Sequence, residues 1–254
     1  MQLQLIRHAT LFIQFGGRRL LLDPMLSPAD AMDPIPNATN ALRIPMVALP
    51  LDDAALADLL ATLDGVLVTH LHRDHWDDRA QTLIPKTVPV LCQPGDEETF
   101  RTAGFATVLP IEDRITWADI DIQRTGGQHG TGELGQLMGP VSGFVLRTPE
   151  EPTLYIAGDT IWCDEVANAL ADHRPDVVVL NAGAAQFLQG DPITMTAADV
   201  ISVCRAAPQA EVIAVHMETI NHCGLTRARL ASEAAAAGLS ERVTIPHDGD
   251  ALTR

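Results

Sequence analysis

Residues 65–75 read GVLVTHLHRDH, a short apolar run that leads directly into three histidines and an aspartate. The apolar run predicts a buried β-strand. His70 and His72 stand two residues apart at its end, so their side chains leave the same face and can bind one ion. The chain then turns, and Asp74 and His75 can reach a second ion. Imidazole and carboxylate groups bind Zn²⁺, Fe²⁺ or Mn²⁺, and such an ion can turn water into a nucleophile.

Three further candidate ligands follow later predicted strands. These are His129, in a glycine-rich segment, Asp159 and His216. Binding sites of α/β proteins form just past the carboxyl ends of strands. His129 could instead be an ordinary loop histidine, and Asp159 could cap the helix expected after it. The shared placement of the three residues downstream of the 70–75 motif favours a metal site.

Other histidines are weaker candidates. His222 follows His216 closely and could position substrate or donate a proton. His247 could replace His216 as a ligand. His173 stands at the end of a predicted helix, where a capping role is the simpler interpretation.

Length and composition limit the classes of protein to consider. The 254 residues are expected to form one domain over residues 1–254, with an aliphatic core, because 46 % are hydrophobic and only 4 % aromatic. The formal charge of −16 argues against a nucleic-acid partner, since phosphate binding needs a basic face. No apolar run is long enough to span a bilayer, and no signal-peptide pattern opens the chain, so a cytoplasmic location is the default expectation. The four scattered cysteines are expected to be free thiols.

Strands and helices are expected to alternate along the chain. Residues 3–15 and 18–22 predict two strands joined by a turn at Gly16-Gly17. Residues 24–50 contain six prolines and predict a loop that either covers a pocket or wraps the surface. The other expected helices are 51–62, 77–84, 95–103, 162–172, 196–206 and 225–237. The other expected strands are 65–69, 88–92, 106–109, 114–117, 119–125, 141–147, 153–157, 176–181, 211–215 and 243–246. This order predicts a layered α/β protein with mixed sheets.

These motifs resemble the metallo-β-lactamase-fold hydrolases over nearly the whole chain. They are most similar to the zinc-dependent hydrolase branch that includes ascorbate-6-phosphate lactonases and the phospholipase D acting on N-acylethanolamine phospholipids. Residues 7–10 (RHAT) and 20–24 (LLLDP) resemble that branch's opening Gly-His-Ala-Thr and Leu-Asp-Pro motifs. Residues 70–75 match its His-x-His-x-Asp-His signature. Arg7 in place of the usual glycine, and the length of residues 24–50, depart from the family pattern.

The resemblance implies a four-layer αββα sandwich of two mixed β-sheets, with the site at one edge between the sheets. It also implies a ligand set for two divalent ions: His70, His72 and His129 for the first, Asp74, His75 and His216 for the second, with Asp159 bridging. His8, Asp23 and His222 are expected to hold ligands in place or to contact substrate.

The expected chemistry is hydrolysis of an ester, lactone or phosphodiester by a hydroxide that bridges the two ions, with Asp74 orienting it. Zn²⁺ is favoured, although Mn²⁺, Fe²⁺, Co²⁺ or Ni²⁺ suit the same ligand types. The charge of the ions would admit a small polar or anionic substrate despite the acidic surface. Arg7 could add to this charge, but a surface position on a strand is the simpler interpretation.

Two other function classes stay open at this point. A non-catalytic metal-binding or interaction protein could use the same ligands, although the ligand set looks complete for catalysis. The resemblance argues against a diiron-type oxidoreductase, because those proteins typically carry glutamate at the position of His72 and a flavin domain that 254 residues do not accommodate. Activity screening with metal analysis would separate the classes. The sequence leaves the oligomeric state open, including a homo-oligomer.

Overall fold

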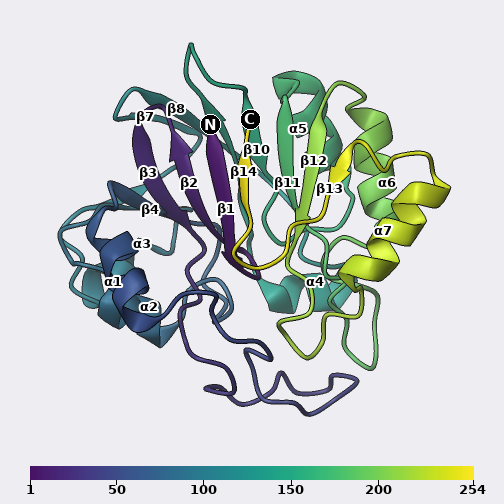
Figure 1. Cartoon of the computed structure of the whole chain (residues 1–254), viewed down its shortest axis with the longest axis horizontal. Coiled ribbons are helices and arrows are strands. Elements are labelled where there is room, and N and C mark those ends of the chain that lie inside the picture. Colours follow the sequence, from purple (N-terminus) through teal and green to yellow (C-terminus); the bar gives the residue numbers. More distant parts are fainter.

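Strands of the N-terminal half, joined by the last strand of the chain, form a seven-stranded sheet in the computed structural model, which describes residues 1–254 (Figure 1). The strand order is β14-β1-β2-β3-β4-β5-β6. Pairing is antiparallel from β14 to β3 and parallel from β3 to β6. The strands are β1 (Gln2–Arg7), β2 (Thr10–Phe15), β3 (Arg18–Leu22), β4 (Gly65–Val68), β5 (Val90–Cys92), β6 (Val108–Pro110) and β14 (Ala251–Thr253).

The later strands form a second seven-stranded sheet, in the order β13-β12-β11-β10-β9-β8-β7. Its strands are antiparallel from β7 to β10 and parallel from β10 to β13. They are β7 (Arg114–Trp117), β8 (Ile120–Thr125), β9 (Gly143–Arg147), β10 (Leu154–Ile156), β11 (Val177–Asn181), β12 (Glu211–Val215) and β13 (Val243–Thr244).

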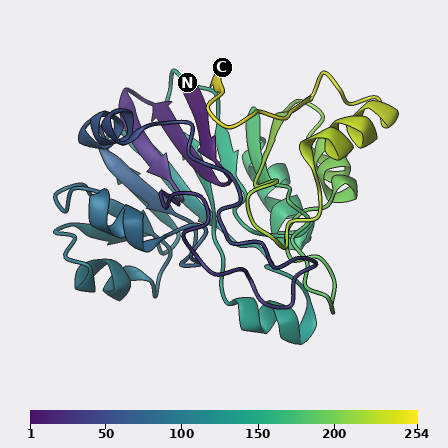
Figure 2. The ribbon, with the colours of Figure 1, turned by 60° about the horizontal axis from the view of Figure 1, so that its bottom comes forward.

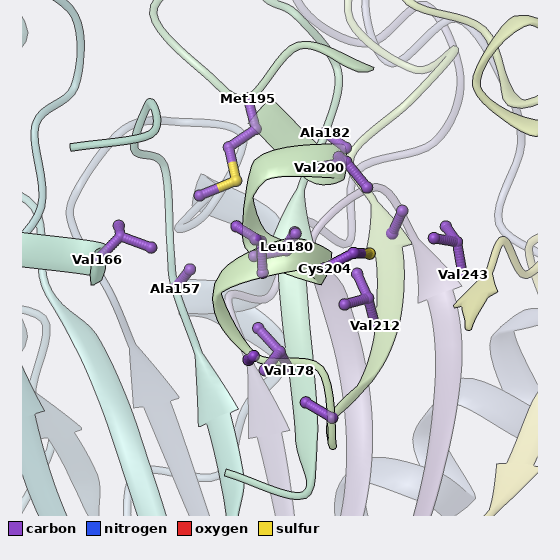
Figure 3. Packing of buried hydrophobic residues seen from close by; sticks show 14 of the residues in the cluster. Ala157, Val166, Val178, Leu180, Ala182, Met195, Val200, Cys204, Val212 and Val243 are labelled. Atoms are coloured by element: carbon purple, nitrogen blue, oxygen red, sulfur yellow. The ribbon is translucent and has the colours of Figure 1, made fainter. Parts of the chain in front are cut away.

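Helices cover the outer face of each sheet. On the first sheet lie α1 (Asp53–Ala61), α2 (Asp78–Leu83) and α3 (Glu97–Thr102), and on the second lie α5 (Asp164–His173), α6 (Ala197–Ala206) and α7 (Arg227–Ala236). The strands β4, β5, β10 and β11 are buried on both faces. In β11, Val177 and Val179 face the other sheet, whereas Val178 and Leu180 pack under the helices (Figure 3). The expected αββα sandwich is confirmed.

Three local expectations were wrong. Residues 3–15 are not one strand, because the chain reverses after Arg7 and β1 pairs antiparallel with β2. His8 makes this turn with a φ of 60°, a conformation for which histidine gives no strong sequence signal. The helix α4 (Gly132–Met138) was missed because its glycines predict a turn. The strand β14 was missed because it is short and lies at the sheet edge.

Residues 24–50 form a long segment held by contacts with the rest of the protein. Within it, an isolated β-bridge joins Met32 to Ile44, and Asp30 donates a backbone hydrogen bond to Pro45 beside that bridge. It crosses the end of the molecule where α4 lies (Figure 2). Met25 and Ile44 are fully buried against Ile220. The segment therefore does more than wrap the surface, because it contributes to the core.

Arg7 holds residues 24–50 in place through hydrogen bonds to their backbone. Its guanidinium donates hydrogen bonds to the backbone carbonyls of Met25, Ser27 and Val47 at 2.8–3.0 Å. The expected surface position of Arg7 was wrong, because the residue is fully buried. Buried carbonyls of a segment without regular pairing need donors, and Arg7 supplies them.

None of the helices combines the length and apolar character needed to cross a bilayer.

Candidate metal centre

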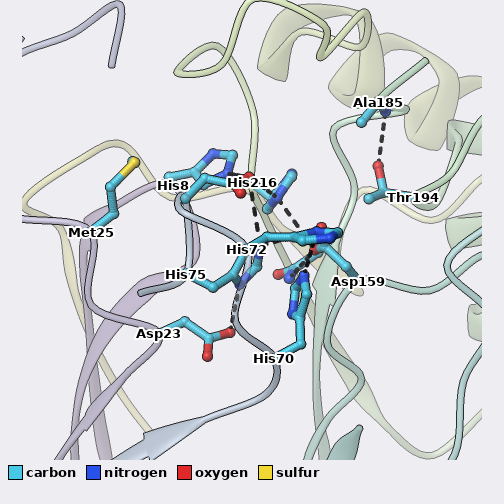
Figure 4. Close-up of polar contacts among 12 residues, drawn as sticks. His8, Asp23, Met25, His70, His72, His75, Asp159, Ala185, Thr194 and His216 are labelled. Atoms are coloured by element: carbon cyan, nitrogen blue, oxygen red, sulfur yellow. Dashed lines mark hydrogen bonds and ion pairs between the residues drawn. The ribbon is translucent and has the colours of Figure 1, made fainter. Parts of the chain in front are cut away.

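The candidate metal ligands meet at one edge of the sandwich because several strands end there. His8 follows β1, His70 follows β4, Asp159 follows β10 and His216 follows β12. Figure 4 shows these side chains converging from both sheets. Residues far apart in the sequence therefore surround one small volume.

A first donor group consists of His70, His72 and His129. Their nearest ligand atoms all lie within 4.8 Å of one another. Nε2 of His70 is 3.0 Å from Nδ1 of His72, and Nε2 of His129 is 3.2 Å from the same atom. The structure thus brings together the three residues that the sequence assigned to one ion.

A second donor group consists of His8, Asp74, His75 and His216. Nε2 of His75 and Nε2 of His216 lie 3.7 and 3.6 Å from Oδ2 of Asp74. Both nitrogens are buried and have no hydrogen-bond partner. Buried polar atoms rarely stay unpaired. A bound cation coordinated by these two nitrogens would give both of them a partner.

Asp159 lies between the two groups. Its Oδ2 is 3.3 Å from Nε2 of His75 and 3.6 Å from Nε2 of His129, and its Oδ1 is 3.3 Å from Nε2 of His216. Asp159 also forms a third compact set of donors with His70 and His75. A single carboxylate therefore contacts members of both groups.

His8 lies closer to the centre than the sequence alone indicates. Its Nε2 is 3.1 Å from Oδ2 of Asp74, and its ring centroid is 3.6 Å from that of His216. Burial, followed by the neighbouring His216, lowers the pKa of His8 to about 3, so the ring is neutral at pH 7. A neutral His8 can donate one hydrogen bond to Asp74 without adding charge.

Outer hydrogen bonds fix the orientation of the histidine rings. Nδ1 of His75 donates to Asp23 at 2.9 Å, and Nδ1 of His129 donates to the carbonyl of Ile193 at 2.8 Å. Nδ1 of His70 contacts Oγ1 of Thr69 at 3.0 Å. When Nδ1 is occupied in this way, Nε2 is left as the atom that faces the centre.

Asn181 completes the outer contacts and was missed in the sequence. Its Nδ2 donates to Oδ1 of Asp159 at 2.7 Å. The available signal was a polar residue at the end of β11, an otherwise wholly apolar strand, in the same kind of position as the predicted ligands. Its amide holds Asp159 in place.

The centre also carries backbone strain. His8, Asp23 and His216 have φ values of 60°, 42° and 71°, a region that side-chain-bearing residues seldom adopt. Such strain costs about 1–3 kcal/mol per residue and clusters at functional sites. Three of the ten non-glycine residues with positive φ therefore lie at this one edge.

The charges of the centre are set by mutual contacts. Burial alone would raise the pKa values of Asp74 and Asp159, but the surrounding histidines outweigh it and hold both well below their ordinary value. Burial would likewise lower the pKa of His75, yet Asp159, Asp23 and Asp74 raise it to about 10. Without a metal, protons on the histidines balance the two carboxylates.

This donor set fits divalent cations. It offers five histidines and two aspartates, all buried except the half-buried His72, with outer hydrogen bonds and with unpaired nitrogens turned inward. Zn²⁺ and similar ions bind this mixture of imidazole and carboxylate groups. The residues are His70, His72, Asp74, His75, His129, Asp159 and His216.

A cavity of about 210 Å³ opens onto the centre. Four apolar side chains form part of its wall: Ile35, Met138, Phe187 and Ile193. His222 also lines it, with its ring 5.7 Å from that of Phe187 and its Nδ1 without a partner. His247 is exposed and lies outside the donor groups.

Comparison with known proteins places the chain in a family. Residues 18–217 match the beta-lactamase superfamily domain. The UPF0173 protein YddR of Bacillus subtilis is 35 % identical over all of both chains. A UPF0173 metal-dependent hydrolase of Xanthobacter autotrophicus is 24 % identical over 81 % of this chain and 79 % of its own.

Solved structures agree with this relationship. The isothiocyanate hydrolase from Delia radicum gut bacteria is 38 % identical, with a TM-score of 0.94 over 100 % of this chain and 99 % of its own. A structure from Veillonella parvula, described as a possible metal-dependent hydrolase, is 36 % identical with a TM-score of 0.96 over the same shares. This chain belongs to the metallo-β-lactamase superfamily and, within it, to the UPF0173 family of metal-dependent hydrolases.

Proposed function

We propose that this chain is a two-metal hydrolase whose substrate is a small, neutral isothiocyanate, R–N=C=S. The observation that carries the proposal is the cavity, in which an apolar wall faces a buried histidine–aspartate centre. Ile35, Met138, Phe187 and Ile193 suit an apolar substituent R. The 38 % identity to an isothiocyanate hydrolase over the whole chain supports the same substrate class.

Two ions are proposed because the donors form two groups that Asp159 connects. His70, His72 and His129 would hold one ion, and Asp74, His75 and His216 the other. Zn²⁺ is the favoured metal. Divalent ions bound there would polarise the substrate and lower the pKa of a bound water molecule to about 7.

The protein's own side chains would position the reactants. Asp74 is ionised, lines the cavity and can accept a hydrogen bond from the attacking water, which orients it toward the central carbon. Burial lowers the pKa of His222 to about 4, so its ring is neutral at pH 7 and can donate a hydrogen bond to the nitrogen or sulfur of the substrate. His8 would keep the Asp74 carboxylate fixed.

The reaction is balanced with one water molecule. Its oxygen forms a bond to the central carbon, and one proton passes to the nitrogen, which gives a thiocarbamic acid. The C–N bond then breaks, the electron pair and the remaining proton go to nitrogen, and the products are an amine and carbonyl sulfide. The apolar wall keeps bulk water away from the substituent R during these steps.

Esters and lactones are the second candidate class. Their carbonyl carbon is attacked by water in the same way, and the cavity would accept a small acyl group. A phosphodiester fits less well, because Arg73 is the one lysine or arginine side chain that lines the cavity, and its Nη2 already donates to the carbonyl of Asp33. The sequence alone favoured a small polar or anionic substrate because of the charge of the ions. The apolar wall of the cavity favours a neutral substrate instead.

Metal removal and restoration test the proposal. The purified protein should contain about two metal ions per chain, and chelation should lower kcat/KM for a small isothiocyanate at least ~100-fold, with recovery when Zn²⁺ is added. His70→Ala should have the same effect, whereas His247→Ala, at an exposed position, should leave activity unchanged. Full activity of metal-free protein would contradict the proposal. Metal binding without turnover of any isothiocyanate, ester or lactone would instead indicate a non-catalytic protein.

A further inference from the structure

A second hollow lies beside the metal cavity. It has a volume of about 470 Å³ and is formed by α4, the segment after β11 and Asn37 of residues 24–50. We refer to its five apolar residues as the leucine shelf: Leu134, Leu137, Met138, Phe187 and Leu188. Asn37 and Gln189 complete the lining, so no charged side chain faces the hollow.

Two leucines of the shelf expose an unusually large fraction of their apolar side chains to water. Leu137 is 78 % exposed and Leu188 is 67 % exposed, the two highest values among the large hydrophobic residues. Single exposed leucines are ordinary on protein surfaces. Two of them in one apolar hollow beside an active site are the kind of surface that a ligand covers.

The shelf continues the wall of the metal cavity. Met138 and Phe187 line both hollows. Met138 and Phe187 therefore form the boundary between the two hollows, and a ligand whose reactive group reaches His72 and His129 would meet apolar side chains at that boundary. Figure 2 shows α4 beside residues 24–50 at this end of the molecule.

We propose that the leucine shelf binds the hydrocarbon tail of the substrate, so that the enzyme prefers isothiocyanates with an extended alkyl or arylalkyl group. This inference rests on the proposed function, since it assigns the reactive end of the same molecule to the metal cavity. A second copy of this chain is a poorer occupant, because a stable interface needs about 20–30 residues on each side. Five apolar residues in a hollow that no charged residue lines suit a tail instead.

A homologous series of substrates tests the shelf. With the metal-loaded protein, kcat/KM for n-alkyl isothiocyanates should rise with each methylene that reaches the shelf, by up to about fourfold per group. The double variant Leu137→Gln with Leu188→Gln should flatten this rise for long tails and leave methyl isothiocyanate unaffected. Glutamine favours a helix at position 137, and both side chains are exposed, so the fold should persist. Leu83→Gln, on α2 in another hollow, is the matched control.

Binding of n-alkyl alcohols to metal-free protein, measured by calorimetry, provides a readout without catalysis. The dissociation constant should fall with chain length in the parent and less steeply in the double variant. The same slope in both proteins would overturn the shelf. A parent protein that is dimeric and a double variant that is monomeric, with equal tail dependence, would also overturn it and would assign these residues to self-association. Tail-dependent alcohol binding without hydrolysis of any isothiocyanate would support the shelf and overturn the proposed function.

Discussion

The Asp23 carboxylate accepts a hydrogen bond from Nδ1 of His75 at 2.9 Å, across the end of β3 and β4. The same carboxylate accepts hydrogen bonds from the backbone N–H and the hydroxyl of Thr69, both at 2.8 Å. Asp23 thus sets the position of a candidate ligand and of the residue that precedes His70. A carboxylate in this role orients the imidazole and increases its basicity.

Asp23→Asn should therefore weaken metal binding by about 10–100-fold, because the amide cannot accept as strongly from His75. Asparagine tolerates the φ of 42° at this position, so the backbone should be retained. Zinc affinity measured by competition with a chromogenic chelator would check this. Asp58→Asn, on the exposed side of α1, is the control. Equal affinities in the two variants would show that Asp23 has no influence on the metal.

Metal affinity should rise with pH. In the metal-free protein the pKa of His75 is raised to about 10, and that of His216 is raised well above its ordinary value by the nearby Asp159, in both cases against the effect of burial. Both rings hold protons at neutral pH, and a metal must displace them. The dissociation constant should fall by about tenfold per pH unit for each proton released. Calorimetry in buffers of different ionisation enthalpy counts these protons, and heats that do not depend on the buffer would contradict the prediction.

His222 should make the metal-free protein sensitive to acid. Burial lowers its pKa from 6.5 to about 4 in the folded state. The unfolded chain therefore binds more protons between these values, and folding stability falls as the pH drops below 6.5. At about pH 5 the loss from this one group is about 2 kcal/mol.

His222→Asn should remove that part of the pH dependence. Urea unfolding at about pH 7 and about pH 5, in the presence of chelator, would measure it as a smaller difference between the two free energies of unfolding than in the parent protein. His247→Asn, at an exposed position, should behave like the parent. A parent-like difference in the His222 variant would show that its ring gains its proton as easily in the folded chain as in the unfolded one.

Gly158 should be intolerant of a side chain for two reasons. Its φ is 70°, and a Cβ there would lie 2.7 Å from the carbonyl oxygen of Ser142. Gly238 has nearly the same φ, 72°, but a Cβ at that position would meet nothing within 4 Å. Gly238→Ala therefore isolates the backbone cost of about 1–2 kcal/mol. Gly158→Ala should cost more, and it should also weaken zinc binding because Asp159 is displaced. Chemical denaturation and zinc titration would measure both effects, and equal losses of stability in the two variants would contradict the prediction.

The motif at residues 70–75 and the positions after strands were readable from the sequence because ligand spacing and strand ends are local properties. A layered α/β protein with mixed sheets was readable for a similar reason, since apolar runs such as β4 and β11 are buried on both faces and need helices outside the sheets. The four-layer αββα order itself came from the family resemblance. The position of His8 could not be predicted in this way, because its contact with Asp74 depends on a turn that the residue types do not indicate.

Periodicity and ligand chemistry act over a few positions, so the fold class and the residues able to bind metal follow from the order of amino acids. Folding added three facts that no local pattern contains: Arg7 is buried beneath residues 24–50, Asn181 contacts Asp159, and Ile35 and Phe187 line one cavity. These contacts join segments far apart in the chain, and their partners are chosen by packing. The residues able to bind metal can therefore be identified from local sequence, whereas the shape of the substrate pocket is decided only by the tertiary structure.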